Sequence, residues 1–265
     1  MIPFFEKIGW TIQEWISVTV EFLRLFVETI YWIFVGPFRG KPVNSSSTFA
    51  QMVFMGVHSI IIVCFVTFFT GIVLAMQSAY QLSKMGATIY VASLVTISIC
   101  RELGPVLTAL VIAGRIGAAI TAEIGSMKVN EQLEALDTMA ISPVRYLVVP
   151  KFLALLLMLP CVTLIGDLAG MLGGYVIGVF NLKINSALYI QTAFKYLTLK
   201  DLYTGLSKPF VFAMIISLVG AFQGLRTKGG AVGVGQATTT SVVTSFILII
   251  LADCVVTGIY FFSDM

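Results

Sequence analysis

The chain has 265 residues, of which 58% are hydrophobic and 11% are charged, and its formal net charge is +3. A soluble domain carries about 25% charged residues. With a mean hydropathy of +0.99, this chain lacks the charges that a water-exposed surface requires. The composition therefore predicts an integral membrane protein and excludes a soluble enzyme, a nucleic-acid-binding protein and a disordered protein. The modest net charge points to no polyanionic partner.

Residues 1–36 are apolar but are interrupted by a polar residue every three or four positions. On a helix these residues form a narrow polar stripe beside a broad apolar surface, which is typical of a helix lying in the membrane interface. The stripe consists of Lys7, Thr11, Glu14, Ser17, Glu21, Arg24 and Glu28. We predict an interfacial amphipathic helix over 1–36 and a membrane domain over 37–265.

Apolar runs long enough to span a bilayer lie at roughly 50–80, 88–122, 146–180, 208–225 and 239–262. The expected fold class is therefore all-α, a polytopic membrane protein with five transmembrane helices. The N-terminal segment and the loops between runs two and three and between runs four and five carry most of the Lys and Arg. The positive-inside rule then predicts a cytoplasmic N-terminus. The opposite side is left with Lys84, Lys183, Lys195, Lys200 and Lys208.

Small residues recur every four positions along the second and third runs, where they allow helix backbones to approach closely. These stripes are Ala109, Ala113, Gly117, Thr121 and Gly125, and Gly166, Gly170, Gly174 and Gly178. We predict a tightly packed bundle. The stripes serve either packing within the chain or a dimer interface.

Charged residues lie inside the predicted spans, where they are costly and normally face protein or a wet cavity. Arg101 and Glu102 precede Pro105, which lacks a backbone N–H and predicts a kink. Because consecutive helical residues point about 100° apart, Arg101 and Glu102 need not pair with each other. They either lock two helices through ion pairs or line a substrate cavity. Asp167 and Asp253 are further candidates, with hydrogen bonding between helices as the plainer role.

Metal-binding and catalytic motifs are missing from the sequence. Cysteines lie only in apolar runs, at Cys64, Cys100, Cys161 and Cys254. With His58 as the only histidine, they are expected to be buried hydrophobes rather than zinc ligands. Neither H-E-x-x-H nor G-x-S-x-G occurs. The glycine-rich segment 230–236 ends on Gln236 where a phosphate loop needs lysine, so we expect no ATPase activity, catalytic residue, metal or cofactor in this chain.

The segment between the second and third runs predicts a short cytoplasmic helix at about 130–141. Asn130 is placed to cap its N-terminus. Leu133, Leu136 and Ala140 share one face, and acidic residues occupy another. Only a membrane surface or a partner is expected to cover the apolar face. The helix is either a docking element for a cytoplasmic partner or an ordinary solvated loop helix.

The most specific pattern in the chain consists of R-E-L-G-P at 101–105, A-G-R-I-G-A-A-I-T-A-E-I-G-S-M at 113–127, E-Q-L-E-A-L at 131–136 and A-T-T-T-S-V-V at 237–243. These segments resemble the MlaE-type (YrbE-type) permeases, the membrane subunits of MCE-associated ABC transporters of lipids. The resemblance implies a homodimer in a bacterial inner membrane, with a separate cytoplasmic ABC ATPase that binds ATP and Mg²⁺. It also implies a STAS-domain protein in some members, a periplasmic MCE ring, and phospholipid transport that maintains outer membrane lipid asymmetry.

The resemblance further implies roles for individual residues. Docking of the ATPase is assigned to Glu123, Gly125, Glu131, Leu133 and Glu134. A lipid cavity at the dimer interface is assigned to Leu74, Gln81, Met85, Arg101 and Glu102. The chain departs from the family at Thr240, where relatives commonly carry a basic residue.

Two other functions compete with a lipid permease driven by a partner ATPase. An ion-coupled secondary transporter would use Glu102, Asp167 and Asp253 as proton carriers. The lack of inverted repeats counts against it. A passive scaffold would only anchor the ATPase and the MCE proteins.

Overall fold

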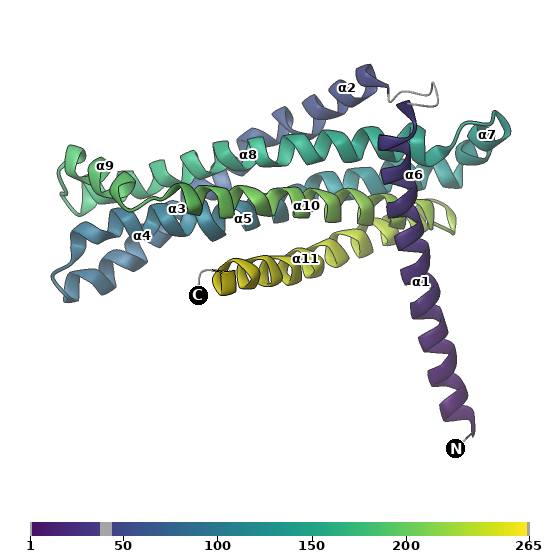
Figure 1. The fold of residues 1–265 in the computed structure, drawn as a ribbon, viewed down its shortest axis with the longest axis horizontal. Helices are drawn as coiled ribbons and strands as arrows, with labels where there is room; N and C mark the ends of the chain where they lie inside the picture. The colour runs from purple at the N-terminus through teal and green to yellow at the C-terminus, as the bar shows by residue number, and fades with distance from the viewer. Residues whose placement is uncertain (1, 38–43, 264–265) are drawn as a thin grey trace.

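The computed structural model describes residues 2–37 and 44–263, and the side chains of 2–12, 14, 15 and 263 lie outside that description. The described residues are mainly helical and contain no strand, as predicted. They form an elongated bundle that the first helix crosses near one end (Figure 1). The helices are α1 (Ile2–Phe34), α2 (Ser45–Met55), α3 (Ile60–Lys84), α4 (Val91–Ser98), α5 (Gly104–Ile112), α6 (Ala118–Val129), α7 (Gln132–Thr138), α8 (Val149–Val176), α9 (Ser186–Lys195), α10 (Leu199–Leu225) and α11 (Gly230–Ser263).

Five helical stretches of the described chain are long and apolar enough to cross a membrane, which confirms the predicted number. They are Ser45–Lys84, Thr88–Val129, Val144–Asn181, Leu199–Leu225 and Gly230–Phe262, with 40, 42, 38, 27 and 33 residues. A straight span needs about 20 residues, so the first three tilt or project beyond a bilayer. Wide π-helical turns interrupt the second stretch at η4 (Ile99–Leu103) and η5 (Ala113–Gly117). The third stretch begins with such a turn, η6 (Val144–Val148), and ends with another, η7 (Ile177–Asn181).

Helix α1 runs across the direction of the spans, at the end of the bundle that also carries α7 (Figure 1). Polar contacts tie its described part to the bundle. Ser142 Oγ donates to Glu28 Oε1 at 3.2 Å, and Arg226 Nε lies 3.6 Å from Glu21 Oε2. This orientation agrees with an interfacial helix, which stays a prediction. Three members of the predicted stripe lie outside the described side chains: Lys7, Thr11 and Glu14.

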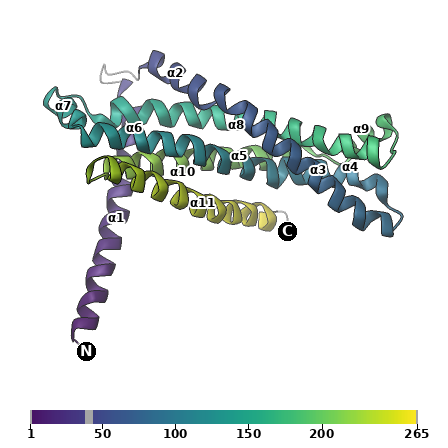
Figure 2. The same cartoon turned by 180° about the vertical axis from the view of Figure 1, so that it is seen from behind.

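Helix α10 lies at the centre of the bundle, where α5, α6, α8 and α11 pack around it. Of its most apolar stretch 67% is buried, against 11% for that of α11. In both views α11 lies along one edge of the bundle and α2 along the opposite edge (Figure 1, Figure 2). The core is therefore built around α10, and α11 leaves most of its apolar surface outside the chain.

The glycine stripe of α8 packs within the chain, so intrachain packing is the use that the structure shows for it. A methyl group at Gly71 of α3 would overlap the carbonyl oxygen of Gly170, and one at Gly173 would overlap that of Phe68. Without Cβ atoms, the backbones of α3 and α8 approach to contact distance. This is the main device for helix association in lipid, where no hydrophobic effect drives helices together.

We predict that Gly71→Ala lowers the free energy of unfolding by about 1–3 kcal/mol, because the added methyl forces α3 away from α8. The measurement is unfolding of the purified protein in one detergent. Gly235→Ala is the matched control, because a Cβ at this position of α11 meets no atom within 4 Å. Equal losses in the two variants would contradict the packing assignment.

Candidate functional site: an ion-pair cluster inside the spans

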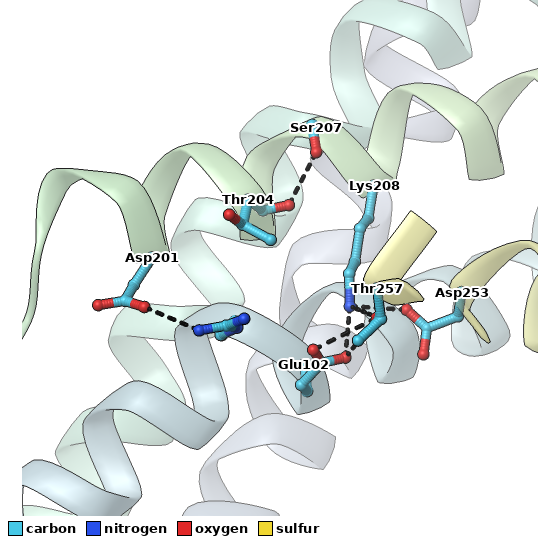
Figure 3. Close-up of polar contacts among 8 residues, drawn as sticks. Glu102, Asp201, Thr204, Ser207, Lys208, Asp253 and Thr257 are labelled. Carbon is cyan, nitrogen blue, oxygen red and sulfur yellow. Dashed lines mark hydrogen bonds and ion pairs between the residues drawn. The ribbon is translucent and has the colours of Figure 1, made fainter. Parts of the chain in front are cut away.

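Three spans meet at a cluster of charged side chains around Lys208 (Figure 3). Lys208 of α10 has a side chain that is 0% exposed, and its Nζ donates to a carboxylate oxygen of Glu102 in η4. Nζ also donates to Thr257 Oγ1 at 2.8 Å and lies 2.8 Å from Asp253 Oδ1, both on α11. The contact with Asp253 is an ion pair without the alignment of a hydrogen bond.

The cluster joins one ammonium group to two carboxylates, so its formal charge is negative. The carboxylates keep some exposure, 35% for Glu102 and 22% for Asp253, while the lysine is enclosed. An enclosed charge in an apolar interior is tolerated only when it is paired and hydrogen-bonded. The arrangement fixes three spans to one another, and the two carboxylates are the part of it that stays partly exposed.

A second ion pair also joins η4 to α10, closer to the N-terminus of α10. Arg101 Nη1 is 3.4 Å from Asp201 Oδ1, and the Arg101 side chain is 32% exposed. The other carboxylate oxygen of Asp201 accepts from the backbone N–H of Thr198 at 3.0 Å and from its hydroxyl at 2.7 Å. Arg101 and Glu102 thus take different partners on α10, as their angular separation predicts.

Local sequence explains why η4 and α10 approach so closely. The π-helical turn ends where Gly104 and Pro105 begin α5, and the Gly104 N–H bonds to the carbonyl of Ile99. A methyl group at Gly205 would overlap the carbonyl oxygen of Cys100, so only glycine lets α10 touch η4 there. Lys208 lies one turn further along α10, which brings its ammonium group to Glu102.

Asp167 of α8 is a separate buried carboxyl group. Its residue is 4% exposed, and Oδ1 has no hydrogen-bond partner among the described residues. It faces Gly104, where a methyl group would overlap Oδ1. The hydroxyl of Thr108 is likewise buried without a partner in the described chain. Oδ1 of Asp167 therefore lacks the expected hydrogen bond between helices. Asp253, in contrast, connects two spans through its ion pair with Lys208.

The sequence analysis puts Lys208 at the first position of the fourth predicted span and counts it among the lysines on the side opposite the N-terminus, whereas the structure places it inside α10. Helix α10 begins at Leu199, because Thr198 and Asp201 form a reciprocal capping box at its N-terminus. Asp201 and Lys208 are seven positions apart and thus share one helix face, opposite the consecutive pair Arg101 and Glu102. That complementary spacing is the signal by which the sequence could have revealed the cluster.

The predicted lipid-contacting residues are only partly brought together. The ion pairs of Arg101 and Glu102 lead to α10, and Glu102 also accepts from Thr257 of α11, so both side chains are engaged away from α3. Leu74 packs on an apolar cluster that includes Val95 and Ile99, close to η4 along the chain. Gln81 and Met85 are exposed at the end of α3. A shared cavity for these residues stays a prediction.

The predicted cytoplasmic helix exists as α7 and is shorter than expected. Asn130 does not cap it, because Asn130 ends α6 and Glu131 follows in a left-handed conformation with φ of 58°. Leu133 is 4% exposed and belongs to the same buried cluster as Leu147 and Val148. The chain itself thus covers part of the apolar face, which corrects the expectation that only a membrane or a partner would do so. Met139, just beyond α7, is 68% exposed.

The remaining docking candidates gather at the same end. Lys151 lies on α8, where its side chain is 4% exposed and donates to Glu123 Oε1 at 2.8 Å. Lys128 donates to Glu134 Oε1 at 2.9 Å. Gly125 packs on Thr227, whose Oγ1 would lie 2.8 Å from an added Cβ. The exposed acids near α7 and the exposed Met139 form what we call the α7 surface: Glu131, Glu134, Asp137 and Met139.

Five apolar helical stretches with paired charges in their interior define a polytopic helical membrane protein. The family model for the permease MlaE matches residues 48–259. A probable ABC transporter permease protein of Rickettsia typhi is 44% identical over 220 residues, covering 83% of this chain and 85% of the relative. A relative of the same description from Synechocystis sp. is 41% identical over 221 residues (83% and 84%), and one from Pyropia yezoensis is 33% identical over 250 residues (94% and 93%). The chain belongs to the MlaE permease family.

We predict that Lys208→Met lowers the free energy of unfolding by about 3–5 kcal/mol, because two carboxylates lose their partner in an apolar interior. Lys208→Met combined with Glu102→Gln and Asp253→Asn removes all three charges and should recover most of the loss. Lys195→Met, at an exposed position, is the control. A triple variant no more stable than the single one would contradict the ion-pair account.

Proposed function

We propose that the chain is the permease subunit of an ABC transporter that moves phospholipid or a related lipid, acting as a homodimer with a separate cytoplasmic ATPase. The relatives described as ABC transporter permeases support the transporter class. The observation that carries the lipid assignment is the Lys208 cluster, a polar group held inside spans that are otherwise apolar. A lipid has the same division between a charged headgroup and hydrocarbon chains.

The outward surface of α11 supports the homodimer. This helix carries Asp253 and Thr257 of the cluster, yet only 11% of its most apolar stretch is buried in one copy. A contiguous exposed apolar surface is typical of an interaction site. A second copy placed on it would enclose a cavity between the two chains, with acidic groups from both clusters along its wall and apolar side chains elsewhere.

The α7 surface supports a cytoplasmic ATPase as the source of energy, with ATP and Mg²⁺ bound by that partner. It joins the second and third spans, and its base is anchored in the core by Leu133. An ATPase that closes on its nucleotide would push α7 together with the ends of α6 and α8. In this proposal the α7 end lies in the cytoplasm of a bacterial inner membrane. The opposite end meets a periplasmic MCE ring, and a STAS-domain protein binds the ATPase.

Contacts of α6 with α10 and α11 connect α7 to the Lys208 cluster. Thr121 Oγ1 of α6 lies 3.0 Å from the carbonyl oxygen of Gly220 on α10 and 2.8 Å from Ser241 Oγ on α11. Gly224 of α10 packs directly on Ile124 of α6. Close-packed helices of this kind shift as units rather than deform. In the proposed mechanism, a push on α6 therefore moves α10 and α11 together and changes the cavity beside Lys208.

A proton-coupled transporter is the second candidate, and the unpartnered carboxyl oxygen of Asp167 favours it. One assay separates the two. The chain and its ATPase are reconstituted in liposomes of labelled phospholipid, and lipid movement is followed with ATP or with a pH gradient. Movement that needs ATP supports the first proposal. Movement that follows the pH gradient and ignores ATP would support the second, and no movement under either condition would leave a passive scaffold.

We predict that Glu102→Gln slows ATP-driven lipid movement about tenfold, the effect of losing one charge-assisted hydrogen bond worth about 1.5 kcal/mol. Assembly with the ATPase should persist, because Glu102 belongs to η4, between α4 and α5, and these helices lie away from α7 along the bundle (Figure 1). Cys161→Ser, at an exposed position of α8, is the control. An unchanged rate in Glu102→Gln would remove the cluster from the transport path, and loss of assembly would make its role structural.

We predict that Glu134→Ala combined with Met139→Ala weakens ATPase binding at least about tenfold, because exposed interface anchors contribute about 1 kcal/mol or more each. The measurement is ATPase recovered with the purified permease. Both side chains are exposed, so the fold should remain intact. Lys183→Ala, at the opposite end, is the matched control. Equal recovery from both variants would show that the ATPase docks elsewhere.

A further inference from the structure

A groove of about 400 Å³ lies between α4, α8 and α9, near the end of the bundle opposite α7. Leu168 and Leu172 of α8 and Phe194 of α9 line it and are 56%, 60% and 59% exposed. Ala193 and Tyr189 also line it and are buried. Since α8 belongs to the third apolar stretch, a bilayer that surrounds this part of the stretch would bring lipid hydrocarbon to the groove.

The walls of the groove are almost wholly apolar. The hydroxyl of Tyr175 is already bonded to Ser186 Oγ at 2.6 Å. Burial raises the pKa of Tyr189 to about 12, so its phenol is neutral at physiological pH. The volume falls within the range of pockets that hold small ligands. A polar ligand would lose its hydrogen bonds to water here without replacement, whereas a hydrocarbon chain would lose none.

Helix α9 is fixed in place and forms a preformed wall. Asn185 caps its N-terminus, with Oδ1 accepting from the backbone N–H groups of Ala187 at 2.9 Å and Leu188 at 3.4 Å. The ring of Tyr189 packs on Gly178, where an added methyl would overlap it. A ligand entering this groove therefore meets a surface that is already ordered, which reduces the entropy cost of binding.

Lysines flank α9 at both of its ends. Lys183 precedes the helix, Lys195 lies in its last turn, and both are exposed. Lys84 is exposed at the same end of the bundle. The acidic residue at this end, Asp201, is buried and paired with Arg101. Lysines at a membrane surface attract anionic lipid headgroups, and each lysine strengthens binding about fivefold.

We propose that the groove binds an acyl chain of an anionic phospholipid from the surrounding bilayer, whose phosphate is held by the lysines at the ends of α9. The apolar walls match the chain and the exposed cations match the headgroup. The site is separate from the Lys208 cluster, and it holds whether or not the transported substrate is a lipid.

The test is native mass spectrometry of the full chain in a mild detergent, titrated with phosphatidylglycerol or with phosphatidylcholine of the same acyl chains. The parent should bind one phosphatidylglycerol more tightly than any phosphatidylcholine. Ala193→Phe fills the groove and should lose that molecule. Cys161→Phe adds the same ring at an exposed position of α8 outside the groove and should keep it.

The headgroup is tested with variants that touch only exposed positions and so leave the fold intact. Lys183→Gln combined with Lys195→Gln should reduce the preference for phosphatidylglycerol at least about fivefold. Lys228→Gln, exposed at the α7 end, should not. The proposal is overturned if Ala193→Phe is folded and binds like the parent. It is equally overturned if the lysine variant keeps the full preference, or if Leu172→Cys cross-links to a partner protein instead of lipid.

Discussion

An ammonium group cannot stay unpaired inside a membrane bundle, and the pairing of Lys208 constrains every element around it. Its partners come from two other spans, Glu102 from η4 and Asp253 from α11. Glu102 reaches it only because α10 touches η4, which the missing side chain of Gly205 permits. The pairing also fixes the position of α11 along α10. One buried charge thus sets the approach of three helices that are distant in the sequence.

The same constraint explains how α11 stays in place although little of it is buried. It is held at two polar points, by Ser241 against Thr121 of α6 and by Asp253 with Thr257 against Lys208. Between these points Ile249 is buried in the core, but Val243, Ile247, Ile250 and Leu251 are more than half exposed. Exposing an apolar helix surface to lipid has no free-energy cost. The polar contacts therefore hold α11 in place, as hydrophobic burial would hold a helix in water. Helix α11 is therefore both fixed within one copy and free to meet another.

The sequence allows the spans, the close helix packing at the small-residue stripes and α7 to be predicted, because each depends on residues that are neighbours along the chain. Other features arise only from tertiary contact. Lys208 falls at the start of a predicted span, and the buried position is visible only once the capping box at Thr198 extends α10 toward its N-terminus. The burial of Leu133 depends on η6 folding back beside α7. The unpartnered oxygen of Asp167 and the groove under α9 depend on how α8 packs, which no local pattern encodes.

The burial of Leu133 changes how α7 would act in the proposed transporter. A solvated loop helix would absorb a push by moving alone. Here Leu133 is part of the core, and an ion pair joins the buried Lys151 near the start of α8 to the half-exposed Glu123 on α6. Force on α7 is therefore shared between α6 and α8, and α10 packs against both. Helix α10 carries Lys208, so a shift of α10 would move the ammonium group relative to its carboxylate partners. Because an ion pair is either formed or broken, Lys208 would either keep its present carboxylate partners or change them. In the proposed transporter the cavity would therefore have two defined states, one for each pairing of Lys208.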